Sequence, residues 1–419
     1  MRGAMRAAVA VTLIVSGLTL PLSQAGAQTL ERRDNVADRD RPGFDPVGIG
    51  VGGMTLLPSL GFELRYDDNI FADDTIKESD TTAIIAPELL LNSRSARHRA
   101  QIGANADLAR YSDFDSEDYD DTRIWALGAM QVGNGELSGE ARLSNVHEER
   151  TSPDDQRGSG LTEFQQDVFG VAYTYSPGRL LGRADLSYRT LNFDNTPTPG
   201  GSINNDDRDR SIADFGLRLG YGMSPDYALY VETRADKIDY DQQFDRDGFA
   251  RSSDGVEVRA GTLLDFTGST IGEFYLGYLR REYEDSRFSR ADGPTFGGQI
   301  DWNISGLTTL SFGGSRTIDA TTIESASGIT TSLIQFGVDH ELLRNLVLSL
   351  DLALGSDDFE GIDRKDDLSE LQLSGRYLMN RNIELRFGYR FRDRDTSPEN
   401  SGGRIYKINE LFLRVVGQL

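Results

Sequence analysis

Apolar and polar residues alternate along most of this chain with a repeat of two. The last stretch, residues 404–419, is the clearest example, because from residue 411 onward one of its two rows is apolar while the other mixes Phe, Arg, Val and Gln. A β-strand has a side-chain period of two, so such a segment has one apolar face and one partly polar face. The apolar row consists of Leu411, Leu413, Val415 and Leu419.

Similar segments recur along the chain, and no long segment with a helical period interrupts them. In residues 346–355 every second residue is Leu, and in residues 383–392 Ile, Leu, Phe and Tyr alternate with Glu, Arg and Gly. A basic side chain facing hydrocarbon at the middle of a membrane costs about 2–4 kcal/mol. The apolar rows are therefore expected to face lipid, and the polar rows to face a hydrated interior.

The connections between these segments alternate between short and long, as in barrels that cross an outer membrane. The pattern predicts an all-β fold, a closed antiparallel transmembrane β-barrel of about 18 strands, or 16–20 if one hairpin is misread. The short connections are expected at residues 93–97, 133–136, 176–179, 224–226, 267–269, 305–306, 342–345 and 379–382. The long ones are expected at residues 67–80, 113–121, 148–163, 194–210, 239–254, 282–292, 317–328, 357–367 and 393–404.

The first residues have the order of a secretory signal peptide. Arg2 and Arg6 precede an apolar run, residues 7–22, and small residues then lead to a cleavage site between Ala27 and Gln28. The chain has no cysteine, which excludes a lipid anchor on cysteine and any disulfide. We therefore expect a signal peptide (1–27), a polar periplasmic segment (28–52) and an outer-membrane barrel (53–419).

An even number of strands places both ends of the barrel on one side of the membrane. Short turns face the periplasm in such barrels, so both termini are expected there, in the outer membrane of a Gram-negative bacterium. Aromatic residues near strand ends are expected to form interfacial girdles, with ordinary packing as the alternative. These aromatic residues are Tyr173, Tyr175, Tyr188, Tyr221, Tyr227, Tyr278 and Trp302.

Acidic residues are concentrated in the long connections. The nine ranges given above contain 41 Asp and Glu but only 13 Lys and Arg, within a chain whose net charge is −23. Such a mouth can attract cations, although the same charge can simply keep the loops soluble. Nucleic acid is not expected as a partner of so acidic a surface.

Charged residues at strand spacing are candidates for the inner wall. Arginine binds carboxylate and phosphate in a planar, bidentate way, so these residues could guide an anionic or hydroxyl-rich solute. The alternative is a network of salt bridges that stiffens the wall, which is favoured by the acid found two positions from many of the arginines. The candidates are Glu140, Arg142, Arg183, Asp185, Arg189, Arg218, Glu232, Arg234, Glu257, Arg259, Arg281, Arg376, Glu384, Arg386 and Arg390.

Catalytic chemistry has little support in the sequence. The only histidines are His98, His147 and His340, and only His147, close to Ser144, is expected at the outer mouth. The acidic stretches 113–121 and 357–367 lack the ligand order of an EF-hand. We therefore expect neither an enzyme nor a cofactor or bound metal ion.

The first third of the chain resembles a known family. The segment Leu60-Gly61-Phe62-Glu63-Leu64-Arg65-Tyr66-Asp67-Asp68-Asn69-Ile70-Phe71, followed by Ile85-Ala86-Pro87-Glu88-Leu89, Arg110-Tyr111 and Asp118-Tyr119-Asp120-Asp121, resembles the opening of outer-membrane β-barrel porins that are often encoded with exopolysaccharide or capsule synthesis genes. The resemblance implies no catalytic residues.

Three functions remain open at this point. The resemblance implies a role in export or assembly of an exopolysaccharide or capsular polysaccharide. An eighteen-stranded bore also suits a general or solute-specific diffusion porin, and a barrel enzyme or a surface adhesion module is the third reading. The expected partners are outer-membrane lipid and lipopolysaccharide, the outer-membrane assembly machinery, and either polysaccharide or small solutes.

Overall fold

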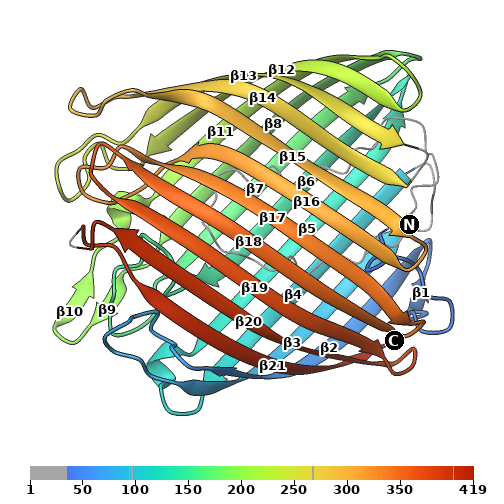
Figure 1. The fold of residues 1–419 in the computed structure, drawn as a ribbon, viewed down its shortest axis with the longest axis horizontal. Helices are drawn as coiled ribbons and strands as arrows, with labels where there is room; N and C mark the ends of the chain where they lie inside the picture. Colours follow the sequence, from blue (N-terminus) through green and yellow to red (C-terminus); the bar gives the residue numbers. More distant parts are fainter. Residues whose placement is uncertain (1–34, 94, 96–97, 267–268, 400) are drawn as a thin grey trace.

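The computed structural model describes residues 35–93, 95, 98–266, 269–399 and 401–419, so the predicted signal peptide and its cleavage site between Ala27 and Gln28 lie outside the described residues. Eighteen antiparallel strands form one closed barrel (Figure 1). They are β2 (Met54–Asp67), β3 (Asp80–Ser93), β4 (His98–Tyr111), β5 (Tyr119–Val132), β6 (Gly135–His147), β7 (Glu163–Tyr175), β8 (Leu180–Phe193), β11 (Arg210–Gly222), β12 (Tyr227–Tyr240), β13 (Ser253–Phe266), β14 (Thr270–Tyr283), β15 (Ala291–Ser305), β16 (Thr308–Asp319), β17 (Gly328–Leu343), β18 (Leu346–Glu360), β19 (Lys365–Leu378), β20 (Ile383–Ser397) and β21 (Tyr406–Gln418).

The barrel closes where its first strand meets its last. Phe62 of β2 is in register with Ile85 of β3 on one side and with Val415 of β21 on the other. Every barrel strand therefore has two hydrogen-bonded neighbours, and no sheet edge is left open. Closure matters in a bilayer because hydrocarbon cannot hydrogen-bond the free N–H and C=O groups of an edge. This fold is the one that the alternation of residues predicts.

Burial is inverted relative to a water-soluble protein. Leu276 and Leu219 on the outer wall are 72% and 63% exposed, whereas Glu384 and Glu232 on the inner wall are 1% and 3% exposed. Lipid contact gives the exposed apolar residues an apolar environment, and the acids lie among arginines of the inner wall. The seven aromatic residues expected in the girdles are all exposed: Tyr173, Tyr175, Tyr188, Tyr221, Tyr227, Tyr278 and Trp302.

The two ends of the barrel differ in their connections. Short turns lie at one end, and the longer loops gather at the other, opposite the C-terminus (Figure 1). The loop end also contains a small hairpin, two 3₁₀ turns and clusters of buried apolar residues, such as Ala326, Ile329 and Phe359. The short elements of the chain are β1 (Ile49–Val51), β9 (Thr196–Thr198), β10 (Gly201–Ile203), η1 (Asp115–Glu117) and η2 (Asp206–Arg208). Within the described part of the chain, no helix has the length and apolar character needed to cross a membrane.

One expected long loop is mostly strand. The sequence pattern predicts a loop at 357–367, but β18 continues to Glu360 and β19 begins at Lys365, which leaves a turn of four residues. Asp357 and Asp366 lie opposite each other in consecutive strands and are only 1% and 0% exposed. Their acidic character indicated a solvated loop, whereas arginines inside the barrel pair with them.

Candidate functional site

The interior of the barrel forms the candidate site. Two adjoining cavities of about 990 Å³ and 1480 Å³ occupy it and share lining residues, among them Arg65, Arg234 and Gln299. The larger cavity is lined by Leu419 near one end and by Arg150 in the loops of the other, so it follows the length of the bore. All fifteen inner-wall candidates from the sequence line one or both cavities: Glu140, Arg142, Arg183, Asp185, Arg189, Arg218, Glu232, Arg234, Glu257, Arg259, Arg281, Arg376, Glu384, Arg386 and Arg390.

Arg234 of β12 is the centre of the densest charge cluster on the wall. Its guanidinium pairs with Asp185 of β8 at 3.3 Å, with Glu232 of its own strand at 3.0 Å and with Asp214 of β11 at close contact. Asp185 and Arg234 meet across Gly216 of β11, where an added Cβ would lie 2.7 Å from an Asp185 oxygen. Glycine therefore permits the contact, and the cluster ties three strands together.

A second charged group lies beside this cluster. Arg218 of β11 pairs with Glu232 at 2.7 Å and with Glu273 at 2.9 Å, and its guanidinium lies 4.0 Å from the ring centre of Tyr230. Arg259 pairs with Glu257 at 2.6 Å. Each of these arginines thus has carboxylate partners, as the salt-bridge interpretation predicts for this side of the wall.

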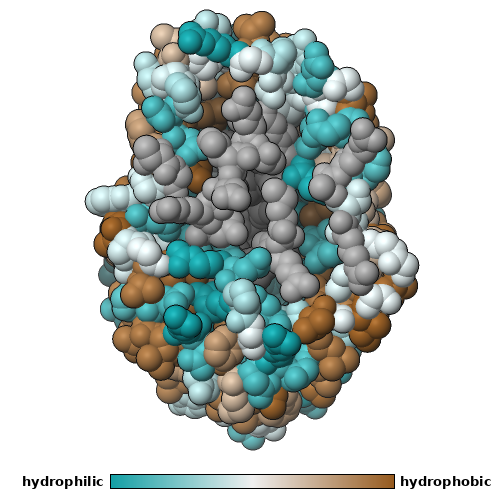
Figure 2. Space-filling view, turned by 90° about the vertical axis from the view of Figure 1, so that its right-hand side faces the viewer, coloured by the Kyte–Doolittle hydropathy of each residue, from teal (hydrophilic) through white to brown (hydrophobic). Residues whose placement is uncertain are grey.

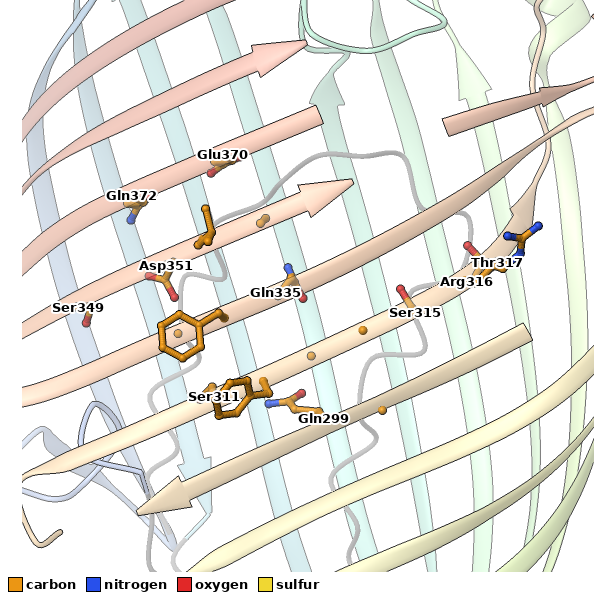
Figure 3. Close-up of a pocket in the computed structure, with 18 of the residues that line it drawn as sticks. Gln299, Ser311, Ser315, Arg316, Thr317, Gln335, Ser349, Asp351, Glu370 and Gln372 are labelled. Atoms are coloured by element: carbon orange, nitrogen blue, oxygen red, sulfur yellow. The ribbon is translucent and has the colours of Figure 1, made fainter. Parts of the chain in front are cut away.

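The wall formed by β15–β19 has a different chemistry. Figure 3 shows amide and hydroxyl side chains from five consecutive strands around one cavity, with the charged residues Arg316, Asp351 and Glu370 among them. Gly313 and Gly337 also line it, which widens the bore there. The uncharged side chains are Gln299, Ser311, Ser315, Thr317, Gln335, Ser349 and Gln372.

The described part of the N-terminal segment lies against the inner wall at the short-turn end. The Val36 N–H donates to Thr309 Oγ1 at 2.9 Å, and Arg41 pairs with Glu341 at 3.3 Å. The Gly48 N–H donates to the carbonyl of the last residue of the chain at 3.1 Å. Polar residues surround the mouth at this end, whereas apolar residues lie on the outer circumference (Figure 2).

This placement differs from the sequence expectation for residues 28–52. That expectation puts the segment in the periplasm ahead of the barrel, but residues 35–47 contact strands β16, β17 and β19 from within, and β1 pairs with the start of β2. The segment is polar because it contacts a polar bore. Its composition could not distinguish this surface from bulk water.

The β6–β7 loop, residues 148–162, crosses the bore at the other end. Asp154 accepts hydrogen bonds from the hydroxyls of Thr321 and Thr322 at 2.9 Å and 3.0 Å. Those threonines lie between β16 and β17, which face β6 and β7 across the barrel in the strand order. Thr151 also accepts a hydrogen bond from Arg394 of β20 at 2.9 Å. The loop therefore narrows the bore.

Buried ion pairs hold this loop in place. Glu148 pairs with Arg208 at 2.7 Å, and both side chains are at most 2% exposed. Arg150 pairs with Glu117 at 2.7 Å, and Asp155 pairs with Arg404 from the β20–β21 loop. A buried pair is strongly destabilised when one partner is removed, because the other charge is left uncompensated. The sequence pattern placed these residues in long, acidic connections and gave no sign of their pairing.

Two loop carboxylates outside the strands, Asp285 and Asp207, are held in the charged form. Hydrogen bonds from the Arg287 guanidinium hold the pKa of Asp285 well below its usual range. Burial opposes ionisation of Asp207, but hydrogen bonds from Arg246 outweigh it and lower its pKa overall. The mouth is therefore still acidic at neutral pH, although much of its charge is paired.

His147 is engaged with Asp121. Its Nδ1 lies 2.8 Å from Asp121 Oδ1, and its ring stacks on Tyr119 with 3.9 Å between the ring centres. Among the described residues it makes no hydrogen bond with Ser144, the nearby hydroxyl considered from the sequence. The described residues also contain no group of three or more His, Asp or Glu placed to hold a metal ion.

The family model described as "Putative beta-barrel porin 2" matches residues 41–419, which is the whole barrel and part of the segment that enters it. The chain belongs to this family. It is accordingly an outer-membrane β-barrel porin, as the fold and the lipid-facing wall indicate. No curated protein matches the sequence of this porin.

Solved structures resemble the porin in outline. OccAB3 of Acinetobacter baumannii is 12% identical with a TM-score of 0.47, and the match covers 88% of this chain and 100% of that one. OccK2 (OpdF) of Pseudomonas aeruginosa, solved in complex with glucuronate, is 13% identical with a TM-score of 0.47, covering 87% and 98%. A mutant of the ferric enterobactin receptor PfeA of the same species is 8% identical, with a TM-score of 0.47, covering 87% and 80%. We base no functional inference on these likenesses.

Proposed function

We propose that this porin is a passive channel for polar solutes, with its short-turn end and both termini in the periplasm. The observation that supports this most directly is the polar cavity that follows the bore from Leu419 to Arg150. The outer wall would contact outer-membrane lipid and lipopolysaccharide, and the assembly machinery of that membrane would insert the barrel.

Ion selectivity in planar bilayers tests the channel. The acidic loops should concentrate cations at the mouth, so the reversal potential in a KCl gradient should indicate cation selectivity at low salt. The selectivity should weaken near 1 M salt, where the screening length falls to about 3 Å. Absence of any ionic current through correctly folded barrels would contradict the proposed channel.

The same measurement has a pH dependence with a definite sign. A carboxylate whose pKa is depressed, such as that of Asp285, stays ionised until the pH falls below its usual range. Cation selectivity should therefore persist from pH 7 to about pH 5 and decline below about pH 4, where ordinary Asp and Glu protonate. Loss of cation selectivity between pH 7 and pH 5, where ordinary Asp and Glu and the depressed Asp285 all stay ionised, would show that the loop acids do not control permeation.

A second candidate function is assistance in export or assembly of an exopolysaccharide or capsular polysaccharide. The amides and hydroxyls on the wall of β15–β19 favour it, because they can exchange hydrogen bonds with a hydrated glycan without holding any one unit tightly. Strong single sites would instead retain the chain.

Deleting the porin distinguishes the two candidates. A polysaccharide role predicts less secreted or surface polysaccharide with nearly unchanged uptake of small solutes, and the combined replacement of Arg183, Arg386 and Arg390 by Gln should reproduce part of the loss. Normal polysaccharide output together with impaired uptake of a small nutrient would leave the simple channel as the function.

A further inference from the structure

Three arginines lie side by side on the inner wall near the short-turn end. Arg376 of β19 is in register with Arg386 of β20, and Arg386 is in register with Arg414 of β21. Neighbouring strands lie about 4.8 Å apart, so the three backbone positions fall within about 10 Å. Like charges directly opposite each other destabilise a sheet. We call Arg376, Arg386 and Arg414 the arginine row.

The row has fewer carboxylates than guanidiniums. Glu384 accepts from Arg376 Nε at 3.0 Å and also from Arg386 Nε. Glu63 lies 3.7 Å from Arg414, but its other oxygen already accepts two hydrogen bonds from Arg65. Two carboxylates thus pair with four guanidiniums, and the terminal nitrogens of Arg386 make no hydrogen bond or ion pair with any described residue.

The contrast with the opposite wall is clear. Arg234 alone contacts three carboxylates, and Arg218 contacts two. The side chains of Arg376, Arg386 and Arg414 are 31%, 39% and 26% exposed, and all three line both cavities. Arg376 Nη1 also donates to the Ala37 carbonyl of the N-terminal segment at 3.3 Å. The remaining N–H groups of the row, those of Arg386 above all, face the bore, whereas the arginines of the opposite wall pair with wall carboxylates.

Packing against β2 sets the position of Arg414, which lies at one end of the arginine row. The guanidinium of Arg414 lies close to Gly61 of β2, where an added Cβ would lie 2.7 Å from Arg414 Nε. Any larger residue would displace this guanidinium, so the glycine provides the space that it occupies. The position of Arg414 is thus set by its own strand, β21, and by the space that Gly61 leaves on β2.

We infer that the arginine row binds carboxylate groups of an anionic solute within the bore, an inference that rests on the proposed channel function. Guanidinium groups bind carboxylates in a planar, bidentate way, and donors unmatched by protein acids gain most from an added anion. Three adjacent guanidiniums suit a ligand with two or more carboxylates. A small polycarboxylate and an acidic glycan present the same chemistry.

Calorimetric titration of the full-length, detergent-folded porin with citrate tests the row directly. Arg376→Gln/Arg386→Gln/Arg414→Gln should weaken citrate binding by about tenfold or more, which is about 1.4 kcal/mol or more, because charge-assisted hydrogen bonds to the carboxylates are lost. The matched control is Arg99→Gln/Arg142→Gln/Arg259→Gln, which removes three inward arginines that each have a nearby carboxylate. The control should change binding by less than about twofold.

Trigalacturonate as a second probe identifies the source of the carboxylates. Tighter binding than citrate would indicate an acidic glycan, and weaker binding would indicate a small solute; both results support the row. Absence of binding of either probe to the wild type, or equal weakening in both triple variants, would overturn it. Calorimetry needs no ionic current, so a barrel that binds citrate but does not conduct would contradict only the proposed channel.

Folding of the variants is checked by heat-modifiable migration on a denaturing gel. If the triple variant does not fold, Arg386→Gln and Arg386→Lys replace it, because Arg386 is the most exposed of the three. Lysine keeps the charge but cannot bind a carboxylate through two parallel N–H groups. Citrate binding should follow the order wild type, Arg386→Lys, Arg386→Gln, and equal affinity in all three would contradict the site.

Discussion

Shortening the β6–β7 loop should raise the single-channel conductance of the barrel by about twofold or more, because the width of the narrowest part limits current. Replacing residues 150–161 with Gly-Ser-Gly removes the segment that hydrogen-bonds to Thr321 and Thr322 across the bore. Conductance in planar bilayers at high salt measures the effect, since screening there minimises changes in local charge.

A deletion elsewhere in the loops provides the control. The tip of the β9–β10 hairpin, residues 198–201, projects from the loop end away from the barrel wall (Figure 1), and its removal should leave the conductance unchanged. The natural chain has no cysteine, so Asp154→Cys/Thr321→Cys offers a second test. Formation of that disulfide with wild-type conductance is expected, whereas failure to cross-link would contradict the crossing loop.

Replacing Arg394 by Leu should lower the free energy of unfolding by about 3–5 kcal/mol, the usual cost of removing one partner of a buried ion pair. Arg394 is 0% exposed and contacts Asp357 and Asp366, each at 3.3 Å. In this variant Asp366 retains its ion pair with Arg364 at 2.6 Å, but Asp357 loses its only ion pair with a described residue. Urea titration followed by heat-modifiable migration measures the change.

An exposed ion pair on the outer wall serves as the matched control. Arg280 and Glu282 are both 56% exposed, so Arg280→Leu should change the free energy of unfolding by at most about 1 kcal/mol. Adding Asp357→Asn to Arg394→Leu should restore part of the lost stability, because the uncompensated charge is then gone. Equal losses for Arg394→Leu and Arg280→Leu would show that the buried network contributes little.

The barrel was predictable because its main signal is local. Alternation in a segment such as residues 346–355 reports which side chains face lipid, and it does not depend on which strands are neighbours. The prediction of a loop at 357–367 was wrong for the same reason, because it used local information alone. The segment around Asp357 and Asp366 has the acidic composition of a solvent-exposed loop. Only the register of β18, β19 and β20 brings Arg394 to these two carboxylates.

For the candidate site, the sequence predicted only which side chains point into the barrel, and not which of them meet. Alternation identified Arg234 and Asp185 as inward residues, but they are 49 positions apart and meet through the registers of three strands. Arg414 lies in the mixed row of the last strand, yet nothing in its own segment places it beside Arg386.

The sequence by itself determined that the chain forms a barrel with an apolar outside, a charged inside and one acidic end, because a period of two and the lengths of connections are properties of single segments. The tertiary structure alone decided how open that barrel is. Polar side chains satisfy their hydrogen bonds equally well in water or against a polar wall, so composition could not say that residues 35–47 and 148–162 lie inside the bore. The contacts of Val36 with Thr309 and of Asp154 with Thr321 join positions 273 and 167 residues apart, and only closure of the strands brings them together.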